Sequence, residues 1–257
     1  MRLKLHLQRI GTANVLPLNY QYPISAWIYR TLEQADETFS AFLHNHGYTT
    51  ARKSFKFFTF SGLQVADFRV HGDRMEVHSP SATLYVHFYL DKPAETFVTG
   101  LFQSRQCRIY DRQSEANFEV GQVEVLPLGV HAETVRLSTL SPLVVGRRNQ
   151  RGHDDYLPPD DPEYASLLQY NLVDKYLATG QPLRPEWADF PFAFRPLGGP
   201  AKSRLVTIKS GTPEETRIRG YLFDFELTAP RQLLELGLLA GLGRYNAGGF
   251  GCCDLKQ

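Results

Sequence analysis

The sequence predicts an α+β fold made of two ferredoxin-like units in tandem, each with the element order β-α-β-β-α-β. Three observations lead to this prediction. Strand and helix patterns follow this order through residues 1–127, the same order returns in residues 128–257, and a glycine-rich segment, GLGRYNAGGFG at 241–251, separates the last helix pattern from the last strand pattern. The 257 residues, 42% of them hydrophobic, suffice for two small domains with cores of their own. We therefore place an N-terminal domain at 1–127 and a C-terminal domain at 128–257.

The first half opens with a strand pattern and continues with two helices. Residues 2–10 alternate apolar and polar side chains, which puts three leucines on one face. Pro23 is a favourable first residue for a helix, and Asp36 is the predicted N-cap of a second, shorter helix. Strand patterns separated by Gly, Asp or Pro follow in FKFFTFSG, DFRV, MEVHS and TLYVHFYL. A helix pattern at 91–105 and strand patterns in CRIY and NFEVGQVEVL complete the first unit.

The second half repeats the order of elements without a visible repeat of sequence. Residues 135–145 are predicted to be extended, and 162–178 form an amphipathic helix pattern. Two strand patterns, RLVTIKS and TRIRGYLFDFEL, come next. A helix pattern at 229–240 and a last strand end the unit.

The glycine-rich segment is not a nucleotide-binding motif. Dinucleotide fingerprints and P-loops place the glycines after a strand and before a helix, whose N-terminal amides face the phosphate. Here the helix pattern RQLLELGLLA precedes the glycines and a strand pattern follows them. Two interpretations remain. The loop amides, with Arg244 and Tyr245, follow an extended polyanion across a sheet, or the glycines serve a tight helix-to-strand reversal that needs positive φ.

Composition excludes several other classes of protein. The 28 basic and 27 acidic side chains leave a net charge of +1, which argues against coating a duplex by charge alone but is compatible with a local basic groove. The N-terminal segment lacks the apolar region of a signal peptide, and no stretch approaches the roughly 18 apolar residues of a membrane span. The three cysteines predict neither a disulfide framework nor a zinc site. We expect a cytoplasmic protein without membrane association.

A family resemblance adds to these interpretations. A glycine-rich segment between the last helix and the last strand of a tandem ferredoxin-like chain resembles the signature of the repeat-associated RNA-binding superfamily. Within it, the chain is similar to the sixth CRISPR-associated family, the endoribonucleases that cut precursor CRISPR RNA within its repeats. The likeness is strongest in GLGRYNAGGFG and in the block from LPLNYQYPISAWIYR through FLHNHGY to KSFKFFTFSGL.

The resemblance implies a catalytic site in the N-terminal domain. The matching residues are Tyr29, His44 and Lys56, with His46 as the alternative to His44. The resemblance further implies CRISPR repeat RNA as the partner, no cofactor and no metal. It leaves association with subunits of a CRISPR effector complex and formation of a homodimer open.

The chemistry implied for these residues is cleavage of RNA by its own 2′-hydroxyl, giving a 2′,3′-cyclic phosphate and a 5′-hydroxyl. It needs a base, an acid and a cation for the phosphorane. Histidine serves as acid or base near neutral pH, and tyrosine becomes a useful base where a cation such as Lys56 lowers its pKa. On one unbroken helix Tyr29 and His44 would stand about 22 Å apart. We therefore expect a break in the helix within residues 33–37.

Each of these residues also has an ordinary structural role to weigh. A half-buried tyrosine, a histidine at a helix end and a lysine on an edge strand are common without any catalysis. A non-catalytic RNA-binding subunit of a CRISPR effector complex is therefore the alternative function. The two functions share the fold and the loop, and differ in whether the three side chains converge.

Basic side chains cluster in spite of the near-neutral total. We predict that three clusters and the loop glycines contact the repeat RNA through its phosphates, with solvated surface charge as the alternative for several of them. The predicted RNA-binding residues are Arg52, Lys53, Arg147, Arg148, Arg151, Lys202, Arg204, Gly241, Gly243, Arg244, Gly248, Gly249 and Gly251. The arginines at 147–151 are expected in a flexible loop.

Overall fold

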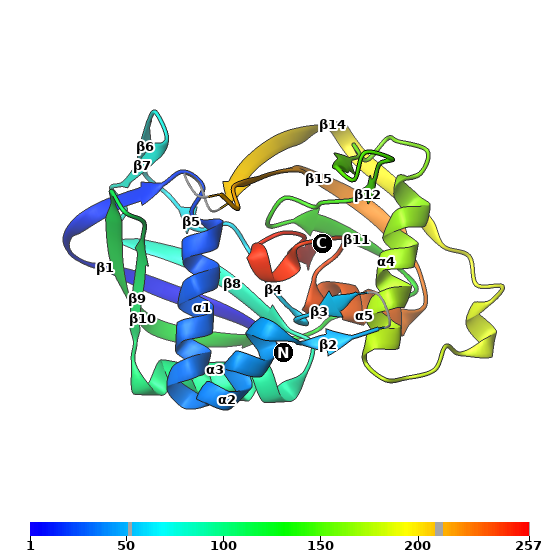
Figure 1. The fold of residues 1–257 in the computed structure, drawn as a ribbon, viewed down its shortest axis with the longest axis horizontal. Helices are drawn as coiled ribbons and strands as arrows, with labels where there is room; N and C mark the ends of the chain where they lie inside the picture. Colours follow the sequence, from blue (N-terminus) through cyan, green and yellow to red (C-terminus); the bar gives the residue numbers. More distant parts are fainter. Residues whose placement is uncertain (51–52, 209–212, 257) are drawn as a thin grey trace.

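The computed structural model describes residues 1–50, 53–208 and 213–256, so the predicted RNA contact Arg52 lies outside the described residues. Figure 1 shows two α+β halves side by side, with the segment after Gly241 between them. No helix in these ranges has the length and apolar character needed to cross a membrane.

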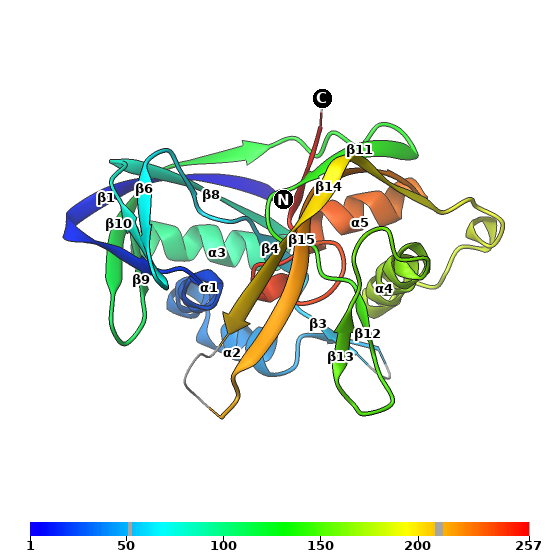
Figure 2. The same ribbon diagram turned by 90° about the horizontal axis from the view of Figure 1, so that it is seen from above.

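Within the described residues, the N-terminal half contains a large antiparallel sheet, a separate pair of short strands and three helices. Its main strands are β1 (Arg2–Pro17), β4 (Phe58–Phe60), β8 (Ser81–Phe88), β9 (Gln106–Tyr110) and β10 (Glu115–Leu126). Its shorter strands are β2 (Tyr48–Thr49), β3 (Ser54–Phe55), β5 (Gln64–Val65), β6 (Phe68–His71) and β7 (Arg74–Val77). Its helices are α1 (Gln21–Ala35), α2 (Glu37–Asn45) and α3 (Asp91–Gln103). Figure 2 shows α1 and α3 on one face of this sheet.

The C-terminal half repeats the plan. Its sheet consists of β11 (Thr134–Thr139), β14 (Ala193–Ile208), β15 (Thr216–Thr228) and β16 (Cys253–Leu255). Its helices are α4 (Tyr164–Ala178) and α5 (Arg231–Ala240), with short 3-10 turns η1 (Pro185–Trp187) and η2 (Asn246–Gly248). A separate hairpin is formed by β12 (Gly146–Arg148) and β13 (Asp154–Tyr156).

Strand order confirms the tandem ferredoxin-like fold. The N-terminal sheet has the order β4-β8-β1-β10, with β9 added at its edge, and the C-terminal sheet has the order β14-β15-β11-β16. If the four strands of each unit are numbered along the chain, both sheets have the order 2-3-1-4, which is the ferredoxin-like arrangement. The predicted alternation of β1 is also confirmed, because Leu3, Leu5 and Leu7 are fully buried. The domain boundary after residue 127 stays a prediction and falls between β10 and β11.

Three local predictions in the second half hold only in part. Arg147 and Arg148 do not lie in a loop, because they pair with Asp155 and Asp154 across the β12–β13 hairpin, whereas Arg151 lies in the turn that joins the two strands. The extended segment predicted at 135–145 ends as a strand at Thr139, after which the chain turns toward the hairpin. Strand β14 begins at Ala193, well before the strand predicted from RLVTIKS.

The predicted break in the first helical segment is confirmed. Asp36 has extended backbone angles (φ −155°, ψ 93°) between α1 and α2, and its Oδ1 accepts a hydrogen bond of 2.8 Å from the backbone N–H of Phe39. The buried hydroxyl of Ser40 then donates to the carbonyl of Tyr29 at 3.2 Å, which fastens α2 back against α1. The two helices therefore fold onto each other instead of continuing in one line.

Loss of this cap gives the first testable prediction. Asp36→Ala is expected to lower the free energy of unfolding by about 1 kcal/mol, because it leaves the first turn of α2 without its acceptor. Urea denaturation followed by circular dichroism measures the change. Asp36→Asn, which keeps a capping acceptor, is the matched control and should stay close to wild type; equal stability of both variants would contradict the capping role.

Candidate functional site

The fold brings Tyr29 of α1 and His44 of α2 into contact. Their ring centroids lie 5.0 Å apart at an interplanar angle of 80°, an edge-to-face arrangement. Tyr29 is half-buried and also meets the ring of Phe58 edge-to-face at 5.6 Å, whereas His44 is exposed. The break at Asp36 is what makes this contact possible, because the same residues on a straight helix would be about 22 Å apart.

Lys56 joins this pair from the turn between β3 and β4. Its Nζ donates a hydrogen bond of 2.9 Å to the backbone carbonyl of His44. The predicted catalytic residues Tyr29, His44 and Lys56 are thus gathered at one place on the surface of the N-terminal half. Lys56 therefore contacts the backbone of His44 and not the hydroxyl of Tyr29.

Gly47 makes room for Lys56, and sequence reasoning did not single it out. Gly47 has φ +66°, a conformation that favours glycine, and its backbone N–H closes α2 by donating to Phe42 at 2.9 Å. A Cβ at this position would lie 2.5 Å from the carbonyl oxygen of Phe55 and 3.1 Å from Nζ of Lys56. The glycine in HNHG was the available signal, since glycine commonly ends helices.

Phe57, which follows Lys56, has a strained backbone. Its φ of +54° lies in the left-handed region, which is costly for a bulky residue and persists only where the surroundings impose it. The side chain is 2% exposed and packs against the rings of Tyr48 and Phe55. This packing holds the turn that carries Lys56 toward His44.

Burial sets the electrostatics of the site and corrects one expectation. Removal of its hydroxyl from water raises the pKa of Tyr29 well above its ordinary value. The expectation that Lys56 lowers the pKa of Tyr29 was therefore wrong, because the ammonium is directed to the carbonyl of His44. Burial lowers the pKa of Lys56 itself. Tyr29 is consequently suited to donate a hydrogen bond from a protonated hydroxyl, and not to act as a base.

His46 occupies a different place from His44. It is the C-cap of α2, where its backbone N–H donates to Phe42 at 2.9 Å and its carbonyl accepts from the hydroxyl of Ser54. Its imidazole is exposed, while the ring that meets Tyr29 belongs to His44. The geometry favours His44 of the two.

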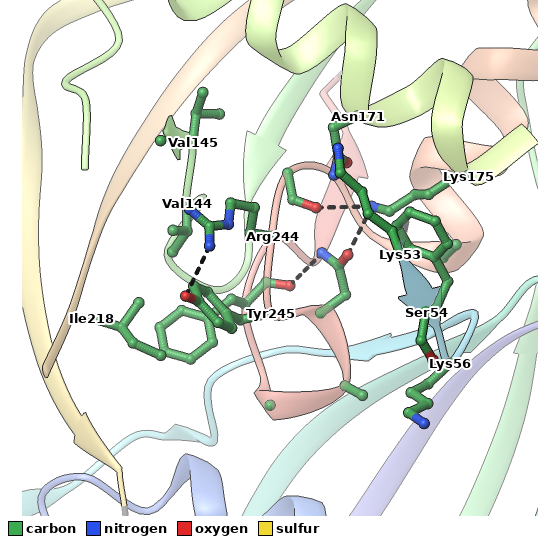
Figure 3. Close-up of a pocket in the computed structure, with 18 of the residues that line it drawn as sticks. Lys53, Ser54, Lys56, Val144, Val145, Asn171, Lys175, Ile218, Arg244 and Tyr245 are labelled. Atoms are coloured by element: carbon green, nitrogen blue, oxygen red, sulfur yellow. Dashed lines mark hydrogen bonds between the residues drawn. The ribbon is translucent and has the colours of Figure 1, made fainter. Parts of the chain in front are cut away.

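A cavity of about 720 Å³ lies beside Lys56, between the two halves. Figure 3 shows Lys53 and Lys56 on one side of it, Arg244 and Tyr245 on another, and Lys175 of α4 above the glycine-rich loop. The charged side chains that line it are Lys53, Lys56, Arg147, Arg148, Lys175, Arg244 and Asp154. Among the described residues, the wall of the cavity thus carries more cationic than acidic side chains, which makes it the local basic groove that the neutral overall charge left open.

Several predicted RNA contacts lie at this cavity but already have acidic partners. The pairs are Lys53 with Asp174, Arg147 with Glu163, and Arg244 with both carboxylate oxygens of Asp154 at 3.0 Å. Arg148 lines the cavity, and Arg151 is exposed at the tip of the β12–β13 hairpin.

Two other predicted contacts are outside the cavity wall. Lys202 is exposed on β14. Arg204 donates to the carbonyl of Leu18 at 3.3 Å, so it connects the two halves.

The glycine-rich loop uses many of its amides internally. The N–H groups of Leu242, Arg244, Gly248, Gly249 and Gly251 all donate to protein carbonyls at 2.8 to 2.9 Å. These amides are not available to a phosphate, which supports the tight-reversal interpretation over a cradle of free amides. The positive φ angles of Gly241, Gly243, Gly249 and Gly251 agree with it. What the loop offers to the cavity is chiefly the side chains of Arg244 and Tyr245.

Lys175 is the other residue that sequence reasoning missed. It is 1% exposed, and its Nζ reaches the carbonyls of Gly241 and Gly243. Its place on the apolar stripe of α4, one turn after the buried Leu172, was the available signal. Within the described ranges, no three His, Cys, Asp or Glu side chains are grouped so that they could hold a metal ion.

Comparison with known proteins decides the family. A sequence model described as "CRISPR associated protein Cas6, C-terminal" matches residues 126–255, half of the chain. The chain belongs to the CRISPR-associated Cas6 family. A second model, of the Cas6 N-terminal region, matches residues 15–123.

Known Cas6 proteins resemble the chain over nearly its whole length. It is 28% identical to "CRISPR-associated endoribonuclease Cas6 1" of Methanocaldococcus jannaschii, over 98% of this chain and 91% of the relative. It is 25% identical to the Cas6 endoribonuclease of Pyrococcus furiosus, over 94% of this chain and 84% of the relative. A solved structure of a Cas6-related protein from Pyrococcus furiosus superposes with a TM-score of 0.83 at 20% identity, covering 100% and 98% of the two chains. This likeness supports the Cas6 fold.

Proposed function

We propose that this Cas6 protein is an endoribonuclease that cleaves precursor CRISPR RNA within its repeats, without a metal ion, through attack by the 2′-hydroxyl. The endoribonuclease role in CRISPR RNA processing rests on family membership and on the two named Cas6 endoribonucleases. The proposed chemistry rests on one observation: the Tyr29–His44 ring contact, with Lys56 bound to the His44 carbonyl.

The proposed roles follow from the position and burial of each side chain. The 2′-oxygen attacks phosphorus while its proton leaves to solvent, and the bond to the 5′-oxygen breaks. The exposed imidazole of His44 gives a proton to that leaving oxygen. The Lys56 ammonium stabilises the negative charge that grows on the phosphorane, and the protonated Tyr29 hydroxyl donates a hydrogen bond that orients the phosphate. The products are a 2′,3′-cyclic phosphate and a 5′-hydroxyl.

We assign the basic cavity to the RNA strand next to the scissile phosphate. Lys56 belongs to the proposed catalytic group and also to the cavity wall, so a strand lying in the cavity would pass the catalytic side chains. We assign its phosphate contacts to Lys53, Arg148 and Arg244, which line the cavity. Where such a cation is now paired with an acidic side chain, an RNA phosphate would compete with that carboxylate.

Cleavage in the presence of a chelator is the decisive test. Purified protein incubated with its cognate repeat RNA in excess EDTA is expected to cut the RNA once per repeat and to leave a cyclic-phosphate end. End analysis before and after acid treatment or phosphatase identifies that end. Stable binding without cutting would favour the non-catalytic RNA-binding subunit instead, and absence of binding would contradict both functions.

A further inference from the structure

Lys175 is a buried cation with three acceptors and no acidic partner among them. Its Nζ donates to the carbonyl oxygen of Gly241 at 2.5 Å, to that of Gly243 at 2.9 Å and to Oδ1 of Asn246 at 2.7 Å. Figure 3 shows the side chain extending from α4 toward the loop. Burial of an ammonium is unfavourable unless hydrogen bonds replace its water, and here three acceptors match its three N–H groups.

Asn246 extends this contact to both ends of the loop. While its Oδ1 accepts from Lys175, its Nδ2 donates to the carbonyl of Leu242 at 2.9 Å and to that of Phe250 at 3.0 Å. The surrounding glycines leave no spare room, because a Cβ on Gly241 would lie 2.5 Å from Nδ2. Lys175 and Asn246 together therefore define the shape of residues 241–250.

The loop backbone and Asp154 together set where Arg244 and Tyr245 point, because the side chains of both residues donate to the Asp154 carboxylate. Both lie between the carbonyl of Gly243, which Lys175 holds, and that of Phe250, which Asn246 holds, and Tyr245 has the strained φ of +62°. The backbone N–H of Arg244 is fixed by the carbonyl of Val144 at 2.8 Å, and its side chain lines the cavity. A change in the loop would thus displace part of the cavity wall.

We propose that Lys175 is a positioning residue for RNA: its ammonium holds the glycine-rich loop in the conformation that presents Arg244 and Tyr245 to the repeat. The proposal rests on the proposed RNA-processing function. Lys175 is too buried to be a phosphate ligand itself, so its effect on RNA is exerted through the loop.

The arrangement also predicts a dependence on pH. Burial is the main cause that lowers the pKa of Lys175 to about 7, the nearby charge of Lys53 acts in the same direction, and Cys253 is the other titratable group close to the ammonium. Burial raises the pKa of Cys253, so it remains a thiol. Among the described residues, the charged groups on the segments packed against α4 are paired with other side chains or face the cavity. They are Arg231 with Glu235, Arg147 with Glu163, Lys53 with Asp174, Arg244 with Asp154, and Arg148. Above its pKa the amine has two N–H groups for three acceptors, so the loop loses one bond.

The experiment compares RNA affinity at two pH values in matched variants. Lys175→Met, which keeps an unbranched side chain as far as Cε but has no donor, is expected to raise Kd for the cognate repeat RNA about tenfold at pH 6.5. Its rate at saturating RNA should change less than about threefold, since the catalytic trio is untouched. The wild type should lose affinity between pH 6.5 and 8.5 more steeply than Lys175→Met does. Lys4→Met, on β1 of the N-terminal half and paired with Glu124, is the control for loss of one positive charge.

The outcomes separate this inference from the proposed function. Wild-type protein that does not bind repeat RNA would overturn the proposed function and the inference with it. Normal binding by the wild type with an unchanged Kd and pH slope in Lys175→Met would overturn the inference alone. If Lys175→Met does not fold, Asn246→Ala replaces it, because this variant removes one of the three acceptors of Lys175. Weaker RNA binding by Asn246→Ala supports the inference, whereas wild-type affinity and a wild-type pH slope overturn it.

Discussion

His44→Ala is expected to slow cleavage of repeat RNA by about 10²- to 10⁴-fold, the usual contribution of a positioned acid or base. The affinity for RNA should stay within about threefold, because the exposed imidazole adds little to the charged surface that binds phosphates. Single-turnover cleavage with protein in excess gives the rate, and fluorescence anisotropy with a non-cleavable 2′-deoxy substrate gives Kd. A rate that falls only in proportion to affinity would contradict a catalytic role.

His46→Ala is the matched control for this experiment. Both imidazoles are exposed and lie two residues apart, but His46 caps α2 and the Tyr29 contact belongs to His44. His46→Ala should therefore cut at close to the wild-type rate. If instead His46→Ala abolishes cutting and His44→Ala does not, the proposed proton donor is assigned to the wrong histidine.

Gly251→Ala is expected to lower the free energy of unfolding by about 3 kcal/mol or more. Gly251 has φ +68°, and a Cβ there would lie 1.9 Å from the carbonyl oxygen of Leu242. The Leu242 carbonyl also accepts a hydrogen bond from the side-chain Nδ2 of Asn246, so it cannot move away from Gly251 without breaking that hydrogen bond. Urea or thermal denaturation measures the loss, and RNA affinity should fall with it because the wall of the cavity is displaced.

Gly248→Ala provides the comparison within the same loop. Gly248 does not have positive φ, and its Cβ would approach only the ring of Phe250, at 3.7 Å. The free energy of unfolding of Gly248→Ala should remain within about 0.5 kcal/mol of the wild-type value. If both variants lost the same free energy of unfolding, the close approach of a Cβ to the Leu242 carbonyl at Gly251 would not be the cause of the loss.

The sequence predicts the fold well where periodicity and capping agree. The break at Asp36 could be predicted because an N-cap residue stands in a polar run between two apolar stripes. The first part of β14 could not, because Pro196, Gly198, Gly199 and Pro200 suggest a loop. The structure accommodates them through an irregularity between Leu197 and Lys202 in the pairing with β15, which depends on a partner strand far along the chain.

The candidate site is predicted in part for similar reasons. The family resemblance proposes Tyr29, His44 and Lys56, and the fold brings them together. The direction of the Tyr29 pKa could not be foreseen, because it depends on burial against Phe58, which is a tertiary contact. Lys175 escaped notice because a lysine in an amphipathic helix usually lies at the solvent-exposed edge. Its acceptors come from a loop about seventy residues later.

The C-terminal segment has a consequence for motion. Its carbonyls at Ala247 and Phe250 accept hydrogen bonds from Ser25 and Thr59 of the other half, at 2.7 and 3.0 Å. A hinge movement that opened the two halves would have to break both bonds. Opening the groove therefore costs at least these two hydrogen bonds, which favours an incoming strand that fits the groove without opening it. Selection among RNAs would then favour strands that can follow the groove as it stands. A stiff duplex would be at a disadvantage to a flexible single strand.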